Sequence, residues 1–223
     1  MPRISHAMYS TVFGVAYLGL VLNLLLAIAC VPIIVLLFIT DPMYSWPLIA
    51  LAAPLCAPAL TAAFTAFRAH HEKGDGPAEA FLVGWRATWR RALGLGAVIT
   101  AAVVVMLVDV RFFSDSAFAV VTVPLLAVLC VIVAAMGIVA LVALSEAPKA
   151  RLRDILQASI YLSLRRWYLS LVTLAALATQ VMLFTSLPAV ALGLTAAPAL
   201  YLAWANARYT LRPVLETTEV AAA

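Results

Sequence analysis

Long apolar runs separated by short polar intervals form the main pattern of this chain of 223 residues. A helix needs about 20 apolar residues to cross a hydrocarbon core that is about 30 Å thick. Six runs are close to or above that length, at about 14–39, 46–67, 92–108, 117–144, 169–187 and 189–207. The pattern predicts an all-α fold: a polytopic membrane helical bundle of six transmembrane helices that forms a single integral membrane domain over residues 1–223.

The first long polar interval, residues 68–91, predicts a further helix outside the hydrocarbon core. Gly74-Asp75-Gly76 ends the preceding helix, and Pro77 suits the first position of a new one. From there aromatic residues recur every four positions and basic residues flank them, which predicts a cytoplasmic amphipathic helix at about 77–91. The residues expected to contact the membrane interface or a docking partner are Phe81, Trp85, Trp89, Arg86, Arg90 and Arg91.

The second polar interval, residues 145–167, repeats this design. Pro148 is expected to start a cytoplasmic amphipathic helix at about 148–167. Its apolar face consists of Leu152, Ile155, Leu156 and Leu162. At its end, Arg165, Arg166 and Trp167 are expected at the membrane interface or against a partner, because basic and aromatic side chains favour the headgroup level.

The two span–helix–span units resemble each other around Pro47 and Pro124. A true duplication and shared constraints at membrane interfaces explain this likeness equally well.

The fourteen Lys and Arg residues set the expected orientation. If the N-terminus is cytoplasmic, thirteen of them lie in cytoplasmic segments and only Arg111 lies outside. Short cytoplasmic loops of membrane proteins have such an excess of basic residues. The distribution therefore predicts that the N- and C-termini are both cytoplasmic.

Composition agrees with a membrane protein. Hydrophobic residues make up 66% of the chain and charged residues 11%, whereas soluble domains are about 25% charged. The net charge of +4 comes from basic residues in the short polar intervals, so membrane lipids, and no nucleic acid, are the expected partners. Cys30, Cys56 and Cys130 all lie in apolar runs and are interpreted as small core residues.

The sequence contains no pattern that predicts catalysis or a bound cofactor. In His70-His71-Glu72, adjacent residues on a helix point about 100° apart, which favours a solvated helix end over a metal site. There is no H-E-x-x-H, G-x-S-x-G or Walker A pattern. We therefore expect no enzymatic activity, no catalytic residues, no metal and no cofactor, and the chain itself is not the ATPase of a pump.

Polar residues inside the apolar runs are few, and Asn23 and Gln180 are the main neutral ones, together with Asn206. Hydrogen bonds between helices explain them better than a substrate path does. Pro54 and Pro58 stand one turn apart and free backbone carbonyls on one side. A packing kink satisfied by Thr61 or Thr65 is favoured over a substrate site of the discontinuous-helix type.

Three stretches of the chain resemble the YesL-like family of bacterial integral membrane domains of unknown function. They are Leu22-Asn23-Leu24-Leu25, the run Pro54-x-x-x-Pro58-Ala59-x-x-Ala62, and the aromatic-basic segment from Phe81 to Arg91. The likeness covers roughly residues 10–210. Span two of that family reads Pro-x-x-x-Gly-Pro-Ala, so Ala57 is a departure where tight packing would use glycine.

The resemblance implies a multi-pass protein of the bacterial cell (inner) membrane that is often found beside carbohydrate ABC importers. The first functional hypothesis is thus a non-enzymatic accessory or regulatory subunit of such a system, in contact with an ABC permease or ATPase. The second is a membrane scaffold that binds anionic lipid through its basic helices. A small independent transporter comes third because the spans have so few polar residues. Substrate, partner identity and oligomeric state are not predicted.

Overall fold

The structure is a computed structural model that describes residues 6–72 and 76–222. These residues are almost entirely helical and contain no strand. Lys73, Gly74 and Asp75, part of the predicted helix break, lie outside the described residues. The elements are α1 (His6–Ala29), α2 (Val31–Ile39), α3 (Pro42–Ala52), the 3-10 turn η1 (Ala53–Cys56), α4 (Ala57–Glu72), α5 (Pro77–Phe113), α6 (Ala119–Glu146), α7 (Leu152–Arg165), α8 (Trp167–Ser186), α9 (Pro188–Val190), the π-helical turn η2 (Ala191–Thr195) and α10 (Ala196–Ala222).

Five helical stretches in the described part of the chain are long and apolar enough to cross a membrane. They are Pro42–Glu72, Pro77–Phe113, Ala119–Glu146, Trp167–Ser186 and Pro188–Arg212. A sixth is present if Phe13–Ala29 and Val31–Ile39, which meet at an angle of 70°, count as one broken span. The fold is therefore all-helical and has the helix lengths of a multi-pass membrane protein.

The first predicted span, residues 14–39, is broken rather than continuous. Cys30 separates α1 from α2, and Pro32 lies in the first turn of α2. Proline has no backbone N–H, and its ring collides with the carbonyl four residues earlier in a continuous helix. The break lies where that carbonyl, on Ile28, would meet the ring.

The residues predicted as a separate interfacial helix at 77–91 instead form the first part of α5. This helix has 37 residues and runs without interruption from Pro77 into the predicted third span. No proline follows Pro77 in it, and Gly94 and Gly96 fit into the helix, so nothing ends it near residue 91. At 1.5 Å per residue α5 is about 55 Å long, well beyond the thickness of the hydrocarbon core.

The second predicted helix begins at Leu152, not at Pro148. Pro148 lies in a turn in which the Ala150 amide donates to the Ala147 carbonyl. Leu162 and Ile155 are buried against the core, and Leu152 and Leu156 pack partly against it. The apolar face of α7 is thus covered by the protein itself.

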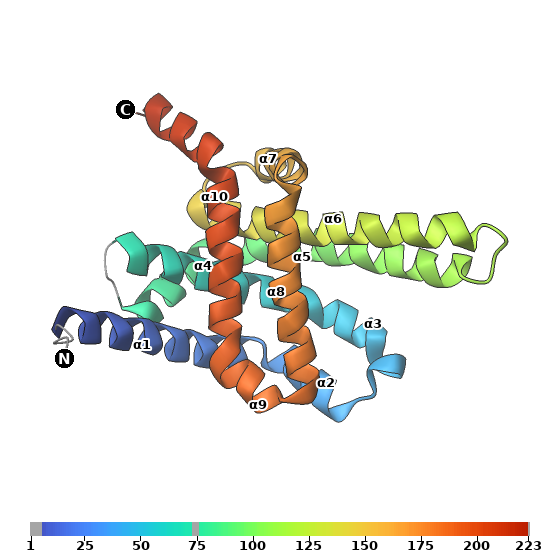
Figure 1. Cartoon of the computed structure of the whole chain (residues 1–223), viewed down its shortest axis with the longest axis horizontal. Coiled ribbons are helices and arrows are strands. Elements are labelled where there is room, and N and C mark those ends of the chain that lie inside the picture. The colour runs from blue at the N-terminus through green and yellow to red at the C-terminus, as the bar shows by residue number, and fades with distance from the viewer. Residues whose placement is uncertain (1–5, 73–75, 223) are drawn as a thin grey trace, which may run out of the picture.

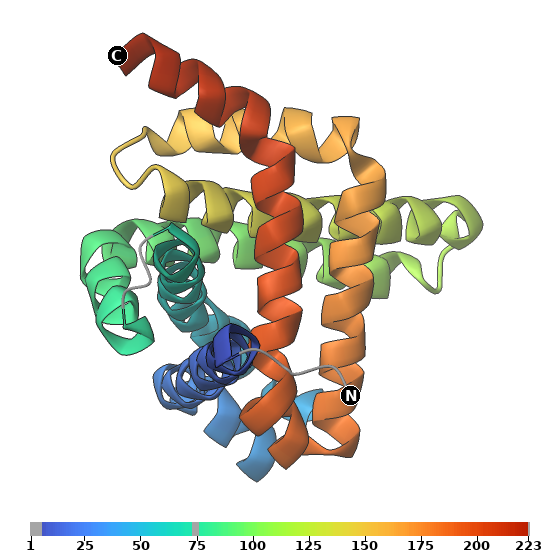
Figure 2. The ribbon, with the colours of Figure 1, turned by 60° about the vertical axis from the view of Figure 1, so that its left-hand side comes forward.

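The helices do not lie side by side in one parallel bundle. In Figure 1 the α5–α6 hairpin runs horizontally, whereas α8 and α10 run vertically. The same steep crossing remains after the turn shown in Figure 2. Small side chains on both partners, Ala135 on α6 and Ala207 on α10 among them, are buried and let steeply crossed helices approach.

The core is centred on α4, which contacts α1, α5, α6 and α10. Four of its alanines are fully buried, and Phe64 is buried with them. Two glycines of α5 allow close approach, since a Cβ on Gly84 would come within 2.7 Å of the Thr65 Cβ and one on Gly96 within 2.6 Å of the Ala57 Cβ. Tight packing beside Ala57 therefore exists, with the glycine on the opposite helix.

Candidate functional site at the polar end of the helices

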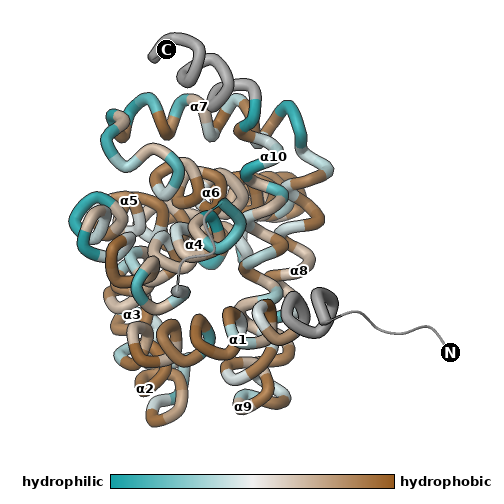
Figure 3. Tube along the Cα trace, turned by 90° about the vertical axis from the view of Figure 1, so that its left-hand side faces the viewer, coloured by the Kyte–Doolittle hydropathy of each residue, from teal (hydrophilic) through white to brown (hydrophobic). Residues whose placement is uncertain are grey.

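Parts of five helices surround a cavity of about 1180 Å³. They are the ends of α4 and α6 and the starts of α5 and α7, and the middle of α10 forms the remaining wall. Figure 3 shows hydrophilic segments around α7 and the polar ends of α4, α5 and α10, in contrast to the hydrophobic α1 and α2. The charged residues that line the cavity are Arg68, Glu72, Glu79, Glu146, Asp154, Arg208 and Arg212. These are ends of helices that the charge distribution predicts to be cytoplasmic.

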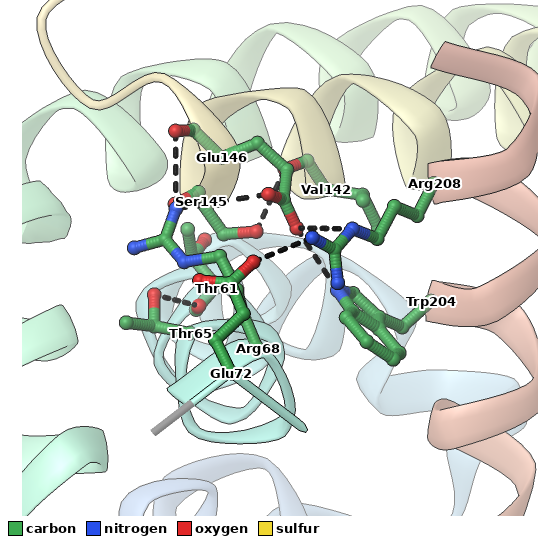
Figure 4. Close-up of polar contacts among 9 residues, drawn as sticks. All are labelled: Thr61, Thr65, Arg68, Glu72, Val142, Ser145, Glu146, Trp204 and Arg208. Carbon is green, nitrogen blue, oxygen red and sulfur yellow. Dashed lines mark hydrogen bonds and ion pairs between the residues drawn. The ribbon is translucent and has the colours of Figure 1, made fainter. Parts of the chain in front are cut away.

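Glu146, the last residue of α6, lies at the centre of this group (Figure 4). Only 6% of its side chain is exposed. Its Oε2 lies 3.7 Å from Nη1 of Arg68, and its Oε1 lies 3.9 Å from Nε of Arg208. Trp204 also donates a hydrogen bond from its indole Nε1 to Oε1, at 3.2 Å. One buried carboxylate thus links α4, α6 and α10.

Arg68 closes the end of α6. Its Nη1 donates to the carbonyl oxygen of Ser145 at 2.7 Å and to that of Glu146 at 3.0 Å. The last carbonyls of a helix have no partner within the helix, and basic side chains satisfy them favourably. The guanidinium therefore acts as a helix cap and as an ion-pair partner at the same time.

Arg208 joins α10 to α4. Its Nη2 lies 2.5 Å from Oε1 of Glu72, and its guanidinium carbon lies 5.3 Å from the centre of the Trp204 ring. Trp204 in turn packs against Phe67 and Tyr201, with ring centres 6.0 and 5.5 Å away. The charged cluster therefore rests on an aromatic one.

Burial raises the pKa of Glu146 above its ordinary value. The positive charges of Arg208 and Arg68 and the Trp204 hydrogen bond act in the opposite direction, whereas the Glu72 charge raises the pKa further. The residue lies two positions past the predicted span 117–144. Loss of hydration destabilises the charged form of a buried carboxylate, and where its partners stabilise that form by less, the carboxylate binds a proton more readily.

The contacts around Glu146 favour a structural linkage over catalysis. Each of its charged neighbours already bonds to another protein group, and no set of three or more His, Cys, Asp or Glu residues able to hold a metal occurs in the part of the chain that the structure describes. His71 of the predicted solvated helix end lies with its ring centre 6.4 Å from that of Trp204. The cavity beside the cluster is lined by the exposed carboxylates of Glu79 and Asp154, which are able to bind a basic group.

The predicted aromatic face of residues 77–91 is graded in exposure. Phe81 is buried, with 3% of it exposed, and its ring lies 6.0 Å from that of Trp85, which is partly buried. Trp89 is 44% exposed and holds the Arg90 guanidinium 5.0 Å from its ring centre. Only the Trp89 end of this face is available to lipid or to a partner.

The basic residues of the same segment have different surroundings. Arg86 and Arg90 are exposed. Arg91 instead donates to the carbonyl oxygens of Pro148 and Ala150 and so joins α5 to the turn before α7. Arg91 is thus a packing residue in the structure rather than a free surface charge.

The three predicted interface residues of the second interval lie between α7 and α8. Arg165 is exposed, and Trp167 is 62% exposed. Arg166 donates from Nη1 to the Tyr209 carbonyl at 2.7 Å and lies 4.7 Å from the centre of the Tyr209 ring. This contact ties the start of α8 to α10.

Asn23 and Gln180 are both bonded within the protein. Asn23 is 3% exposed; its Nδ2 donates to the Gly193 carbonyl at 2.9 Å, and its Oδ1 accepts from the Ala197 amide at 2.6 Å. Gln180 donates from Nε2 to the Ala191 carbonyl and accepts from the Thr195 hydroxyl, each at 2.8 Å. Both side chains thus form hydrogen bonds with residues of the π-helical turn η2.

Pro54 lies in η1 and Pro58 in the first turn of α4. Pro58 has no N–H to donate to the Pro54 carbonyl four residues earlier. That carbonyl instead accepts a hydrogen bond from the Ala57 amide, in 3-10 geometry. The Thr61 hydroxyl donates to the Ala57 carbonyl at 2.7 Å, so it does not satisfy a carbonyl that a proline leaves free.

Sequence reasoning did not identify the Glu146 cluster. Arg68 and Arg208 were used only to predict the membrane orientation of the chain. No functional or structural role was predicted for Glu146 or Trp204. A usable signal exists: Glu72 and Glu146 are the acidic residues that directly follow the second and fourth apolar runs. Acids at such positions are expected to find basic partners from neighbouring helices.

Comparisons of the chain with family models, with curated proteins and with solved structures find no match. The class of protein therefore rests on the chain's own features, which define an all-helical protein with five or six helices able to span a membrane.

Proposed function

We propose that this chain is a non-enzymatic protein of the bacterial inner membrane that serves as an accessory or regulatory subunit of a carbohydrate ABC import system. Its termini are cytoplasmic in this proposal, and the cavity at the polar end receives a segment of the permease or of the ATPase. The choice of system rests on the resemblance to the YesL-like family.

The observation behind docking is the size and lining of the cavity. Its volume of about 1180 Å³ is above the roughly 300–1,000 Å³ of small-molecule sites, so a protein segment suits it. Glu79 on α5 and Asp154 on α7 are exposed on its walls and form no ion pair with any other described residue. A partner segment with basic residues would complement these carboxylates.

The polar groups within the helices support a subunit over an independent transporter. Asn23 and Gln180 form hydrogen bonds with backbone groups of η2 and α10. A solute path needs polar side chains that face a cavity, and such side chains along a span usually mark the path. The polar cavity of this chain instead lies at the helix ends.

Co-purification in mild detergent tests the proposal. A tagged chain expressed in its own organism should retain a permease or an ATPase in stoichiometric amount. Replacing Glu79 and Asp154 together by Lys should abolish this retention, because the cavity would then repel a basic segment. The matched control is Asp115→Lys in the α5–α6 turn, an exposed carboxylate far along α5 from the cavity.

Recovery of the chain with lipid alone would contradict the subunit role and favour a lipid-binding scaffold. Retention of the partner by the Glu79 and Asp154 variant would move the docking surface away from the cavity.

A further inference from the structure

Two arginines from different helices meet on one tyrosine at the start of α8. The guanidinium carbon of Arg166 lies 4.7 Å from the centre of the Tyr209 ring, and that of Arg212 lies 5.6 Å from it. Arg166 is fixed there by its hydrogen bond to the Tyr209 carbonyl. Both guanidinium groups therefore contact the ring of the same tyrosine.

Among the side chains that the structure describes, residues 13–72 and 76–212, no carboxylate forms an ion pair with Arg166 or Arg212. Arg68 and Arg208, which belong to the same polar end, are instead paired with Glu146 and Glu72. Both guanidinium groups are positively charged, and a bound anion offsets the repulsion between nearby like charges. Guanidinium groups match the oxygens of a phosphate in shape and bind it with charge-assisted hydrogen bonds.

The helix next to the pair adds to this positive field. Arg166 is the residue before α8, a helix of 20 residues whose first turn has no acidic residue and no side-chain cap. The start of a helix has a partial positive charge and favours anions. Exposed Arg165 lies beside Arg166 in the chain and adds a further cation.

The surroundings indicate where the anion comes from. Trp167 and Tyr168 are 62% and 51% exposed and directly follow Arg166. Exposed Trp and Tyr side chains favour the level of lipid headgroups, and the predicted span 169–187 begins at the next residue. The pair of arginines is thus at the depth at which lipid phosphates lie.

We propose that Arg166 and Arg212, gathered on Tyr209 at the start of α8, bind a phosphate group, which in the membrane is the headgroup phosphate of an anionic lipid. Arg212 and Tyr209 also line the cavity, whereas Arg166 does not, and the carboxylates Glu79 and Asp154 proposed for docking take no part in phosphate binding. Lipid binding and partner retention are measured separately, so the two proposals can fail independently.

The test measures lipid retained by the full chain. Purified protein in detergent is mixed with phosphatidylglycerol or with phosphatidylcholine, and bound lipid is counted by native mass spectrometry. Replacing Arg166 and Arg212 by Gln should lower the affinity for phosphatidylglycerol by roughly tenfold or more, because each basic residue at the surface contributes to anionic-lipid binding. The matched control, Arg151→Gln with Arg153→Gln, removes the same charge from exposed positions at the start of α7 and should retain the lipid.

Arg212→Gln alone guards against a folding defect, because the described contact of Arg212 is with the Tyr209 ring and not with the backbone. It should lower the affinity by several-fold while the thermal unfolding temperature stays unchanged. Inorganic phosphate is then added as a competitor. Displacement by phosphate together with a preference for phosphatidylglycerol supports a headgroup site, whereas phosphate binding without any lipid preference assigns the site to a soluble phosphate group.

Equal retention of phosphatidylglycerol by the wild type and by the Arg166 and Arg212 variants, without phosphate binding, would overturn the proposal. So would an equal loss in the Arg151 and Arg153 control, since the effect would then follow net charge alone.

Discussion

Asn23 on α1 bonds to the backbone amide of Ala197 on α10, 174 positions away in the chain. Its Oδ1 accepts from that amide at 2.6 Å, and its Nδ2 donates to the Gly193 carbonyl at 2.9 Å. In a regular α-helix an amide donates to the carbonyl four residues earlier, which for Ala197 is the carbonyl of Gly193. One side chain of α1 thus bonds to both of these groups where η2 leads into α10.

Removal of this carboxamide should be costly. We expect Asn23→Leu to lower the free energy of unfolding by about 1 to 3 kcal/mol, because a buried donor and a buried acceptor lose their partner together. Asn206→Leu is the matched control: Asn206 donates one bond, to the Thr173 hydroxyl at 3.2 Å, and its loss should matter less. Thermal unfolding in detergent measures both variants, and equal losses would show that the bridge to α10 has no special role.

Close approach of α5 and η1 gives a second expectation. Gly96→Ala should destabilise the protein by about 1 to 3 kcal/mol, because the added methyl meets the Ala57 Cβ at 2.6 Å and the Pro54 carbonyl oxygen at 3.3 Å. Gly94→Ala, two residues earlier on the same helix, meets nothing within 4 Å. That control should be neutral or slightly stabilising, since alanine favours a helix more than glycine does. Similar unfolding temperatures for the two variants would contradict the observed packing.

The buried carboxylate predicts a pH dependence of stability. A carboxyl whose pKa is higher in the folded state binds a proton more readily there than in the unfolded chain. Stability should therefore fall as the pH rises from the ordinary value of 4.5 through the folded-state pKa of Glu146. Glu146→Gln should flatten this part of the profile, whereas the control Glu79→Gln, on an exposed side chain, should leave it in place. Unfolding temperatures recorded over this pH range decide, and an unchanged slope in Glu146→Gln would count against the assignment.

The orientation of the chain is testable by labelling single cysteines. With Cys30, Cys56 and Cys130 replaced, a cysteine at exposed Ser114 should react with an impermeant reagent from outside, and one at exposed Lys149 should not. Labelling of both positions from the same side would exclude the predicted topology.

The aromatic residues of α5 should differ in their roles. Trp85→Glu should destabilise the fold by about 2 kcal/mol or more, because its ring packs on the buried Phe81. Trp89→Glu should leave the fold intact and weaken contact with lipid or a partner. Quenching by brominated lipids, in variants that keep one tryptophan, should be strong for Trp89 and weak for Trp85. The reverse order would place the face of the helix differently.

Sequence alone predicted the class of fold because long apolar runs and polar intervals are local features. The break at Cys30 was also within reach, since Pro32 marks it, but the apolar run on both sides concealed it. The continuity of α5 was missed because amphipathic residues 77–91 and apolar residues 92–108 differ in composition, although no residue between them ends a helix.

The candidate site was harder to predict, because it depends on how distant helices pack. Arg68 and Glu146 are 78 positions apart in the chain, and only the crossing of α4, α6 and α10 brings them together. The bond from Arg91 to the turn at Pro148 likewise requires the packing of α5 on that turn. The steep crossing of the two hairpins has no signature in hydrophobic pattern, which reports the length of a span and not its direction.

The polar cavity and the α5–α6 turn share one continuous helix. The first turn of α5 lines the cavity, Gly96 holds its middle closely against Ala57, and its last residue, Phe113, adjoins the turn. At 1.5 Å per residue these places are some tens of ångströms apart, yet a single backbone element fixes the distance between them.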